Sequence, residues 1–287
     1  MNYRKRFRVK AGTKVKLDRI DPAFTTEHDP KKKALEETEE CVRAIDELQR
    51  QMYAERRHSL LIVLQGLDAA GKDGTIRHVL SGVNPQGCSV AGFHEPTGEE
   101  LAHDFLWRIH PHAPARGQIA IFNRSHYEDV LVVRVHKLAP KSVWSRRYDL
   151  INDFERNLHL ENDTTILKFF LHISKEEQLA RFEQRLDDPL RQWKISESDY
   201  REREYWNAYT EAFEEVLLRT STDDAPWFVI PSDHKWFRDL AISHIILETM
   251  RDMSIEMPKP TVDLAEIRRK YHEAIRGSRH RGRRGRG

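Results

Sequence analysis

The sequence predicts an α/β fold built on an open, mostly parallel sheet of five strands. Five apolar runs of strand length alternate along the chain with longer stretches of helical spacing, which is the pattern of a parallel sheet. The first run leads directly into a glycine-rich turn and a helical stretch, the order that a strand-to-helix connection requires. The five runs are Ser59–Leu64, Cys88–Phe93, Gly117–Phe122, Thr165–Ile173 and Pro226–Pro231.

Length and composition favour a single large domain with a full core. The chain has 287 residues, of which 39% are hydrophobic and 33% are charged, well away from the composition of disordered proteins. Cys41 and Cys88 are too few for a disulfide framework or a metal cluster, so we interpret them as small buried residues in a reducing compartment. No apolar run is long enough to span a membrane, and no signal-peptide core follows the basic start. We therefore expect a cytoplasmic protein without membrane contact.

The N-terminal residues 1–30 are expected to form a basic arm across the body. They lack clear periodicity and carry seven lysines and arginines between Arg4 and Lys16. The triplet Lys31 to Lys33 then begins a helix that leads into the first strand, and we favour a solvated helix start over a guide for an anionic chain. The main domain is expected over residues 31–255, with an extension over 256–287.

The stretch SLLIVLQGLDAAGKDGT, residues 59–75, predicts a phosphate loop between a strand and a helix. Gly66, Gly71 and Lys72 have the Gly-x-x-x-x-Gly-Lys spacing, in which backbone N–H groups, the helix N-terminus and a lysine bind anionic oxygens. The alternative is a tight strand-to-helix turn without a ligand. Asp73 stands where the usual loop has Ser or Thr as a magnesium ligand, so metal binding must be arranged differently here.

The polar run NRSHYED, residues 123–129, follows the third strand. Ligands of open α/β sheets bind beyond the carboxyl ends of the strands, so this run should face the phosphate loop. Arg124 suits bidentate pairing with phosphate, and Glu128 suits hydrogen bonds from a base. Asp129 suits a hard metal ion shared with Asp68. A helix cap or a surface ion pair remains an alternative for each of them.

The remaining elements follow the same alternation. A helix is expected over Thr97–Ile109, starting with a capping box, and His110 and His112 after it are interpreted as a surface turn rather than a zinc site. Further helices are expected over Val143–Leu158, Tyr200–Leu218 and Trp236–Met253. Residues 277–287, GSRHRGRRGRG, have too little apolar content to fold.

A basic segment after the fourth strand predicts a lid. In RFEQRLDDPLRQWKIS, residues 181–196, the Asp188-Pro189 pair breaks a helix and four cations surround the break. In a phosphoryl-transfer enzyme such charges cover the transferring group and exclude water. The alternative is an amphipathic helix with a solvated basic face. The four cations are Arg181, Arg185, Arg191 and Lys194.

Three motifs together resemble the family-2 polyphosphate kinases. They are GLDAAGKDGT at 66–75, FNRSHYEDV at 122–130 and RLDDPLRQWKIS at 185–196, in the family's order, and the similarity spans roughly residues 1–255. The resemblance implies a three-layer α/β/α P-loop kinase fold with a helical lid at about residues 181–204. It also implies a homodimer or homotetramer that transfers a phosphoryl group between inorganic polyphosphate and a nucleotide with Mg²⁺ or Mn²⁺.

Carried over by position, the resemblance assigns roles to individual residues. The implied catalytic residues are Asp68, Lys72, Arg124, Asp129 and Arg185. The nucleotide would be bound by Asn123, Arg124 and Glu128, and the metal ion by Asp68 and Asp129. The phosphates would be bound by Gly66, Ala69, Ala70, Gly71, Lys72, Asp73, Gly74, Thr75, Arg181, Arg191 and Lys194. Much of the family has Asp at the position of Asn123 and Trp at that of His126. The pattern here is similar to the branch that accepts nucleoside monophosphates as well as diphosphates, and Asn123 leaves more of the metal to Asp68 and Asp129.

The expected activity is reversible transfer of the terminal phosphoryl group of polyphosphate to ADP or AMP, with guanine nucleotides as further acceptors. In-line transfer through a loose transition state needs position and charge rather than a strong general base. One alternative is an ATP-dependent nucleoside or nucleotide kinase of the same fold. Another is a nucleic-acid-binding protein, because the arginine-glycine tail suits non-specific contact with polyanions.

Overall fold

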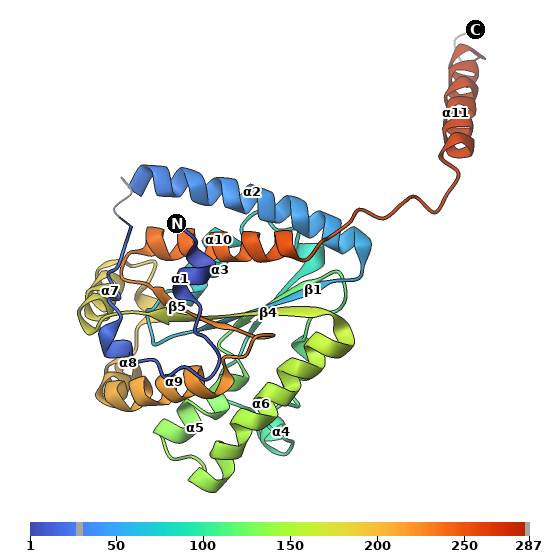
Figure 1. Ribbon diagram of the computed structural model, residues 1–287. Coiled ribbons are helices and arrows are strands. Elements are labelled where there is room, and N and C mark those ends of the chain that lie inside the picture. Colours follow the sequence, from blue (N-terminus) through green and yellow to red (C-terminus); the bar gives the residue numbers. More distant parts are fainter. Residues whose placement is uncertain (27–30, 285–287) are drawn as a thin grey trace. The chain divides into compact units, whose positions relative to one another are not determined.

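The computed structural model describes residues 1–26 and 31–284 (Figure 1). These residues belong to two compact units, which divide after Ile255. The first unit holds a five-stranded sheet, and every strand pairing in the described residues is parallel. The sheet order is β2-β3-β1-β4-β5, which confirms the predicted fold class. The strands are β1 (Ser59–Gln65), β2 (Cys88–Gly92), β3 (Ile119–Asn123), β4 (Thr164–His172) and β5 (Trp227–Pro231).

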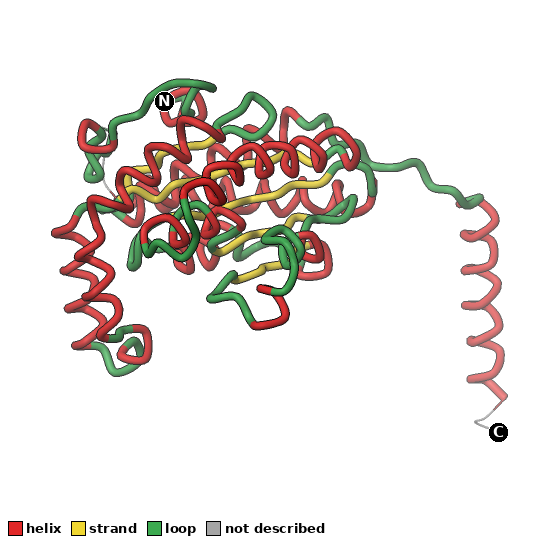
Figure 2. The backbone as a smooth tube through the Cα atoms, turned by 90° about the horizontal axis from the view of Figure 1, so that it is seen from below, coloured by secondary structure: helices red, strands yellow, loops and turns green. Residues whose placement is uncertain are grey.

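Helices cover both faces of the sheet, as Figures 1 and 2 show. The helices of this unit are α1 (Tyr3–Phe7), α2 (Lys31–Glu55), α3 (Lys72–Val79), α4 (Gly98–Leu101), α5 (Val132–Val135), α6 (Lys141–Asn162), α7 (Lys175–Asp187), α8 (Glu197–Glu202), α9 (Trp206–Thr220) and α10 (Lys235–Asp252). Alternate residues of β1 point to opposite faces: Leu60 and Ile62 pack in the core with α2 and α10, whereas Leu61 and Val63 pack in the core with α6 and α9.

The N-terminal segment packs on the body through buried side chains and one edge of the sheet. Tyr3 and Phe7 are buried, and Phe7 lies against Phe237 of α10 with ring centroids 6.0 Å apart. Val9 N donates to Trp227 O at 2.8 Å, and Arg8 forms an antiparallel bridge with Phe228. The segment therefore covers the outer edge of β5, which would otherwise expose unpaired backbone groups.

Two predicted helices are shorter or broken in the structure. The helix expected over Thr97–Ile109 is only the short α4, although its capping box is present. Beyond α4 the Asp104 carboxylate accepts from Leu106 N at 3.0 Å, a local contact that favours a turn over helix. The helix expected over Tyr200–Leu218 is divided into α8, a 3₁₀ turn at Arg203–Tyr205 and α9.

The second unit contains helix α11, Leu264–Arg284. Asp263 caps its start by accepting from Ala265 N and Glu266 N at 2.9 and 3.2 Å. Arg269 pairs with Glu266 and Glu273 along the helix. The helix therefore extends into residues 277–284, where composition predicts an unfolded tail. Residues 285–287 of that tail lie outside the described residues. None of the described helices has the length and apolar content that a membrane span requires.

Candidate active site

The phosphate loop connects β1 to α3 through three residues with positive φ, the first of which is Gly66 at +157°. Ala69 has φ of +61° and Gly71 has φ of +107°, a region that residues with a side chain rarely adopt. A Cβ atom on Gly71 would also collide with the guanidinium of Arg238, so glycine is required here for two reasons. Lys72, Asp73 and Gly74 form the first turn of α3, whose N–H groups have no acceptor within the helix and are available to an anion.

The side chain of Lys72, the first residue of α3, reaches back to the start of the loop. It is 9% exposed, and its Nζ donates to Gly66 O at 2.7 Å and to Leu67 O at 3.4 Å. Burial and the neighbouring Arg124 lower its pKa to about 8, against the opposing effect of Asp68. The ammonium group is therefore held at the loop with carbonyl oxygens as its partners.

Arg124 connects the phosphate loop to the turn after β3. It follows β3 directly with φ of +62°, and its Nη2 donates to Asp68 Oδ1 at 3.0 Å. Its Nη1 lies 3.6 Å from Glu128 Oε2. Residues from two other predicted motifs meet at Asp73, which accepts from Asn123 Nδ2 at 2.9 Å and from Lys194 Nζ at 3.0 Å. The structure thus brings the loop, the turn after β3 and the lid segment together.

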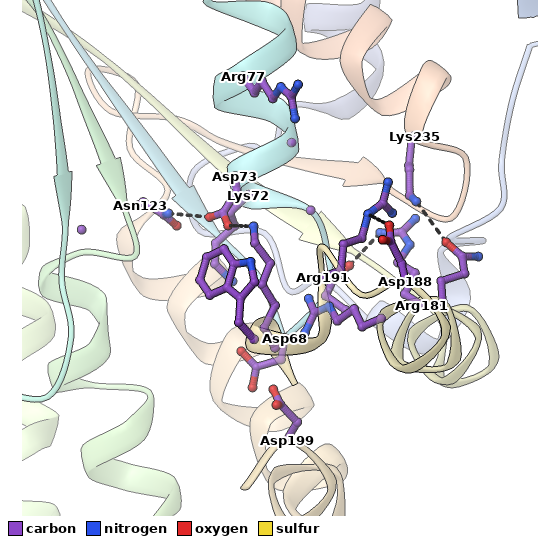
Figure 3. A pocket seen from close by; sticks show the side chains of 18 of the residues that line it. Asp68, Lys72, Asp73, Arg77, Asn123, Arg181, Asp188, Arg191, Asp199 and Lys235 are labelled. Atoms are coloured by element: carbon purple, nitrogen blue, oxygen red, sulfur yellow. Dashed lines mark hydrogen bonds and ion pairs between the residues drawn. The ribbon is translucent and has the colours of Figure 1, made fainter. Parts of the chain in front are cut away.

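A cavity of about 900 Å³ opens above the phosphate loop (Figure 3). We call it the basic cleft, because nine lysines and arginines line it against four aspartates among the described residues. Loop residues Asp68, Ala69 and Gly71 to Gly74 form its floor, and the segment from Arg185 to Lys194 forms one wall. Arg77 of α3, Lys235 of α10 and Arg238 of α10 supply cations that the sequence did not single out.

The predicted lid cations Arg185, Arg191 and Lys194 all line the basic cleft. Arg185 Nη1 donates to Lys194 O at 3.0 Å, which joins the helix to the returning chain. Arg191 pairs with Asp188 at 2.9 Å. Guanidinium and ammonium groups lining a cavity suit anionic oxygens.

A second cavity of about 430 Å³ lies beside the loop, and we call it the aromatic pocket. Trp206, Tyr209 and Phe213 of α9 line it, together with Leu131 and Val132. Its charged residues are mostly acidic: Asp68, Glu95, Glu128, Asp199 and Glu202, against Arg124 and Arg203. Asp68, Arg124 and Asp199 line both cavities, so these three residues form a shared wall between a cationic and an apolar, acidic space.

Two predicted site residues are placed differently from the expectation. Arg181 lines the basic cleft but is only 5% exposed, and its guanidinium donates to backbone carbonyls behind the loop. Asp129 lines neither cavity, and Arg147 and Arg108 hold its carboxylate at 2.9 and 3.8 Å. Consecutive residues of the 3₁₀ turn His126–Asp129 diverge, so Glu128 reaches the pocket and Asp129 turns away from Asp68.

Not all of the predicted phosphate-loop residues line the basic cleft. Gly66 lines the aromatic pocket rather than the basic cleft. Ala70 and Thr75 line neither cavity, and both are buried. Ala70 N donates to Leu67 O at 3.1 Å inside the loop, which removes that N–H group from the set available to phosphate.

A buried network of charges supports the turn that carries Arg124. Lys168 of β4 donates to Glu155 Oε2 at 2.6 Å, to Tyr127 OH at 3.0 Å and to Thr220 O at 2.6 Å, so all three of its N–H groups are used. Glu155 Oε1 in turn accepts from Tyr127 OH at 2.8 Å and lies 3.1 Å from His126 Nε2. These side chains are fully buried and connect the turn His126–Asp129 to β4 and α6.

The residues present fit a magnesium ion bound with its substrate. No group of three or more metal-binding side chains occurs in the described part of the chain. Mg²⁺ needs only one or two carboxylates when phosphate oxygens and water complete its octahedral coordination. Asp68 stands on the shared wall, and its Oδ2 has no hydrogen bond from Arg124, whose contact is with Oδ1.

Comparison with known proteins places the chain in a family. The family model "Polyphosphate kinase 2 (PPK2)" matches residues 28–258. An AMP/ADP-polyphosphate phosphotransferase of Meiothermus ruber is 49% identical over 257 residues, 89% of this chain and 96% of the relative. An ADP-polyphosphate phosphotransferase of Rhodopseudomonas palustris is 45% identical over 273 residues, 90% of this chain and 93% of the relative.

A solved structure supports the same assignment. The crystal structure of polyphosphate kinase 2 from Arthrobacter aurescens TC1 superimposes with a TM-score of 0.88 and 39% sequence identity, covering 92% of this chain and 95% of that one. The sheet order, the loop after β1 and the motifs at 66–75, 122–130 and 185–196 all lie within the matched span. The chain belongs to the polyphosphate kinase 2 family.

Proposed function

We propose that the protein transfers the terminal phosphoryl group of inorganic polyphosphate to AMP and ADP, and that the reaction is reversible. One observation carries the proposal: a cation-lined cleft and an aromatic, acidic pocket share Asp68 and Arg124 in their lining. The names of the relatives, which act on AMP, ADP and polyphosphate, support the same substrates.

The basic cleft is the proposed site of the donor. A polyphosphate chain carries a negative charge on every phosphate, and an excess of five cations over carboxylates among the described lining residues matches such a ligand. The N–H groups of Gly71 to Gly74, with Lys72, would hold the terminal phosphates at the floor. Arg185, Arg191 and Lys194 would hold the chain from the lid side.

The aromatic pocket is the proposed site of the acceptor nucleotide. Its apolar wall of Trp206, Tyr209 and Phe213 suits a flat base, and Glu128 is an acceptor for the exocyclic amine of adenine or guanine. Guanine nucleotides therefore belong to the proposed acceptors. The excess of carboxylates keeps polyphosphate itself out of this pocket.

The chemistry requires position and charge. An oxygen of the acceptor's terminal phosphate attacks the terminal phosphorus of the polymer, one P–O–P bond breaks, and the polymer leaves one phosphate shorter. Arg124 at the shared wall would bind the transferring group, and Lys72 would neutralise charge on its oxygens. Asp68 would hold a Mg²⁺ or Mn²⁺ ion, which would supply further neutralisation of the phosphate charge.

A donor assay tests the proposal. The protein is incubated with long-chain polyphosphate and Mg²⁺, without ATP, and with either AMP or ADP, while products are followed by ³¹P NMR and chromatography. We expect ADP and ATP to form as the polymer shortens. If neither nucleotide is phosphorylated in a preparation that is folded by circular dichroism, the proposal is wrong.

The observation that favours a second donor is the side chain of Trp193. It lines the basic cleft and is 77% exposed, so its ring is available for stacking on a base. A nucleoside triphosphate donor, as in an ATP-dependent nucleotide kinase of this fold, would use such a contact. The same assay with ATP in place of polyphosphate separates the two, because only an ATP-dependent kinase would be faster with ATP than with the polymer.

We also propose that the enzyme is a cytoplasmic homodimer or homotetramer and that residues 277–287 add weak, salt-dependent affinity for polyanions. Family resemblance supports the first proposal, and the arginine content of the tail supports the second. Light scattering after gel filtration tests the oligomeric state. Deleting residues 277–287 should weaken retention on a heparin column and leave turnover unchanged, and a loss of turnover would contradict this separation.

A further inference from the structure

Helix α7, which leads into the lid segment, also holds the back of the phosphate loop. Gln178 Nε2 donates to Asp68 O at 2.8 Å. One turn further along, Arg181 Nη1 donates to Ala69 O at 2.8 Å and to Ala70 O at 3.0 Å. Three consecutive carbonyl groups of the loop are therefore bound by side chains of one helix.

These contacts determine which way the loop's N–H groups point. A trans peptide is planar, and its C=O and N–H bonds point in opposite directions. When Arg181 binds Ala70 O behind the loop, the N–H of Gly71 in the same peptide must point away from Arg181. Arg238 Nη1 also lies 3.3 Å from Ala70 O, which strengthens this orientation. The positive φ of Ala69 and Gly71 is maintained by these bonds.

Arg181 itself has no donor left for a phosphate. Besides the two loop carbonyls, its Nη2 donates to Ser232 O and to Asp233 O at 2.9 Å, and its Nε donates to Glu177 Oε1 at 2.8 Å. All five N–H groups of the guanidinium are thus engaged. A positively charged side chain in the wall of the basic cleft therefore has a different task from the cations around it.

Gln178 is held in one orientation by the returning end of the lid segment. Arg203 Nη1 donates to Gln178 Oε1 at 2.6 Å, so the amide nitrogen must face Asp68 O. Arg203 follows α8, and Arg185 lies one turn beyond Arg181 on α7. Both ends of the lid segment therefore meet at the side chains that bind the loop.

We propose that Gln178 and Arg181 are positioning residues, which orient the N–H groups of the phosphate loop and couple the loop to Arg185 through helix α7. Neither residue touches the transferred phosphate. The proposal rests on the proposed function, because it takes the loop as the site of the donor's phosphates. It gives the lid segment a second role, since displacing α7 changes the loop as well as the position of Arg185.

The experiment compares Arg181→Lys and Gln178→Glu with two reference variants. Lysine keeps the charge of Arg181 but has one nitrogen, which cannot bridge the loop and Ser232 together. Glutamate keeps the shape of Gln178 but has no donor for Asp68 O. Arg185→Ala removes a phosphate-facing cation, and Arg156→Lys, on the exposed face of α6, is the matched control for an arginine-to-lysine change. If either Arg181→Lys or Gln178→Glu does not fold, the remaining one of these two variants decides the outcome.

Two measurements are made on each variant. The affinity for tripolyphosphate is measured by calorimetry at several salt concentrations, and the amides of Gly66, Gly71 and Gly74 are observed by NMR after selective labelling with ¹⁵N-glycine. For Arg181→Lys and Gln178→Glu we expect about tenfold weaker binding with an unchanged salt dependence, because no contact to phosphate is lost. Their Gly71 and Gly74 signals should move in the absence of ligand. Arg185→Ala should instead reduce the salt dependence by about one ion and leave these signals in place.

The outcomes separate the two proposals. Unmoved glycine signals in Arg181→Lys, together with a reduced salt dependence, would make Arg181 a phosphate ligand and overturn the inference. If the unchanged protein does not bind tripolyphosphate, the proposed donor site is wrong, and the glycine signals alone still decide whether Gln178 and Arg181 orient the loop. Arg156→Lys should match the unchanged protein in both measurements.

Discussion

The basic cleft and the aromatic pocket differ in almost every property except the wall between them. The cleft is lined by an excess of cations and closed on one side by an exposed segment, whereas the pocket is lined by aromatic rings and carboxylates. Asp68 and Arg124 belong to both. The difference indicates two ligands of opposite character, and the shared wall indicates where they react. Substitutions in the cleft, in the pocket and in the wall should therefore have different kinetic effects.

The largest effect is expected at the wall and the loop. Asp68→Ala and Lys72→Ala should each lower kcat by about a thousandfold or more, because each removes charge at the transferring group itself. Both variants should unfold near the midpoint of the unchanged protein in urea. Near-normal turnover in either variant would mean that transfer does not take place at this wall.

The next effect concerns the support of the turn that carries Arg124. Lys168→Met leaves the buried carboxylate of Glu155 without its cation and should lower the free energy of unfolding by about 3–5 kcal/mol. The double variant Lys168→Met, Glu155→Leu removes both charges and should recover most of that loss. By contrast, Lys194→Ala breaks the more exposed pair with Asp73 and should cost less than about 1 kcal/mol. Urea unfolding of the three variants tests this contrast, and an equal loss in all three would contradict it.

Smaller effects are expected on the KM of one substrate at a time, depending on which cavity is altered. Arg185→Ala should raise KM for polyphosphate and lower kcat by about tenfold to a hundredfold, with KM for AMP nearly unchanged. Trp206→Ala should raise KM for AMP by about tenfold, because a stacking surface is lost, with KM for polyphosphate nearly unchanged. Steady-state kinetics with each substrate varied in turn provides the measurement. If both variants changed the same KM, the assignment of donor and acceptor to separate cavities would be wrong.

The smallest expected effect is a dependence of kcat/KM for polyphosphate on pH, caused by the titration of Lys72 in the basic cleft. The pKa of Lys72 is lowered to about 8, so the free enzyme loses this charge as the pH rises through that value. We expect kcat/KM for polyphosphate to fall several-fold between pH 7.5 and about 9 for this reason. Since an unfolded lysine still binds its proton in this range, the free energy of unfolding should rise over the same interval. A profile that is flat through pH 8 would contradict the assigned role of Lys72.

Much of the fold and the centre of the site could be predicted from sequence pattern. The strand SLLIVLQ, the glycines and Lys72 are local in sequence, so spacing alone places the loop between β1 and α3. The alternation of apolar runs likewise predicts the parallel sheet. Asn123 and Lys194 could be predicted as site residues, although their meeting at Asp73 depends on tertiary contacts that no pattern encodes.

Sequence pattern could not predict the contacts that depend on the direction of a side chain. Arg181 and Arg185 are one turn apart on α7 and both line the cleft, yet only the structure shows that the N–H groups of Arg181 all donate to protein oxygens. Asp129 follows Glu128 and turns to Arg147 instead. No sequence pattern indicated a role for Arg238. Gly74 gives an indirect indication, because a Cβ atom at Gly74 would lie 3.3 Å from Arg238 Nη2. A glycine outside the Gly-x-x-x-x-Gly-Lys spacing thus indicates a close neighbour.

The most direct test of two separate sites joined at one wall is whether both ligands bind at once. AMP is titrated into the protein by calorimetry in the presence of EDTA, which prevents turnover, first alone and then with saturating tripolyphosphate. Separate cavities predict that the affinity for AMP changes by no more than about threefold and that the number of sites stays the same. Displacement of AMP by tripolyphosphate would show a single common site and contradict the account.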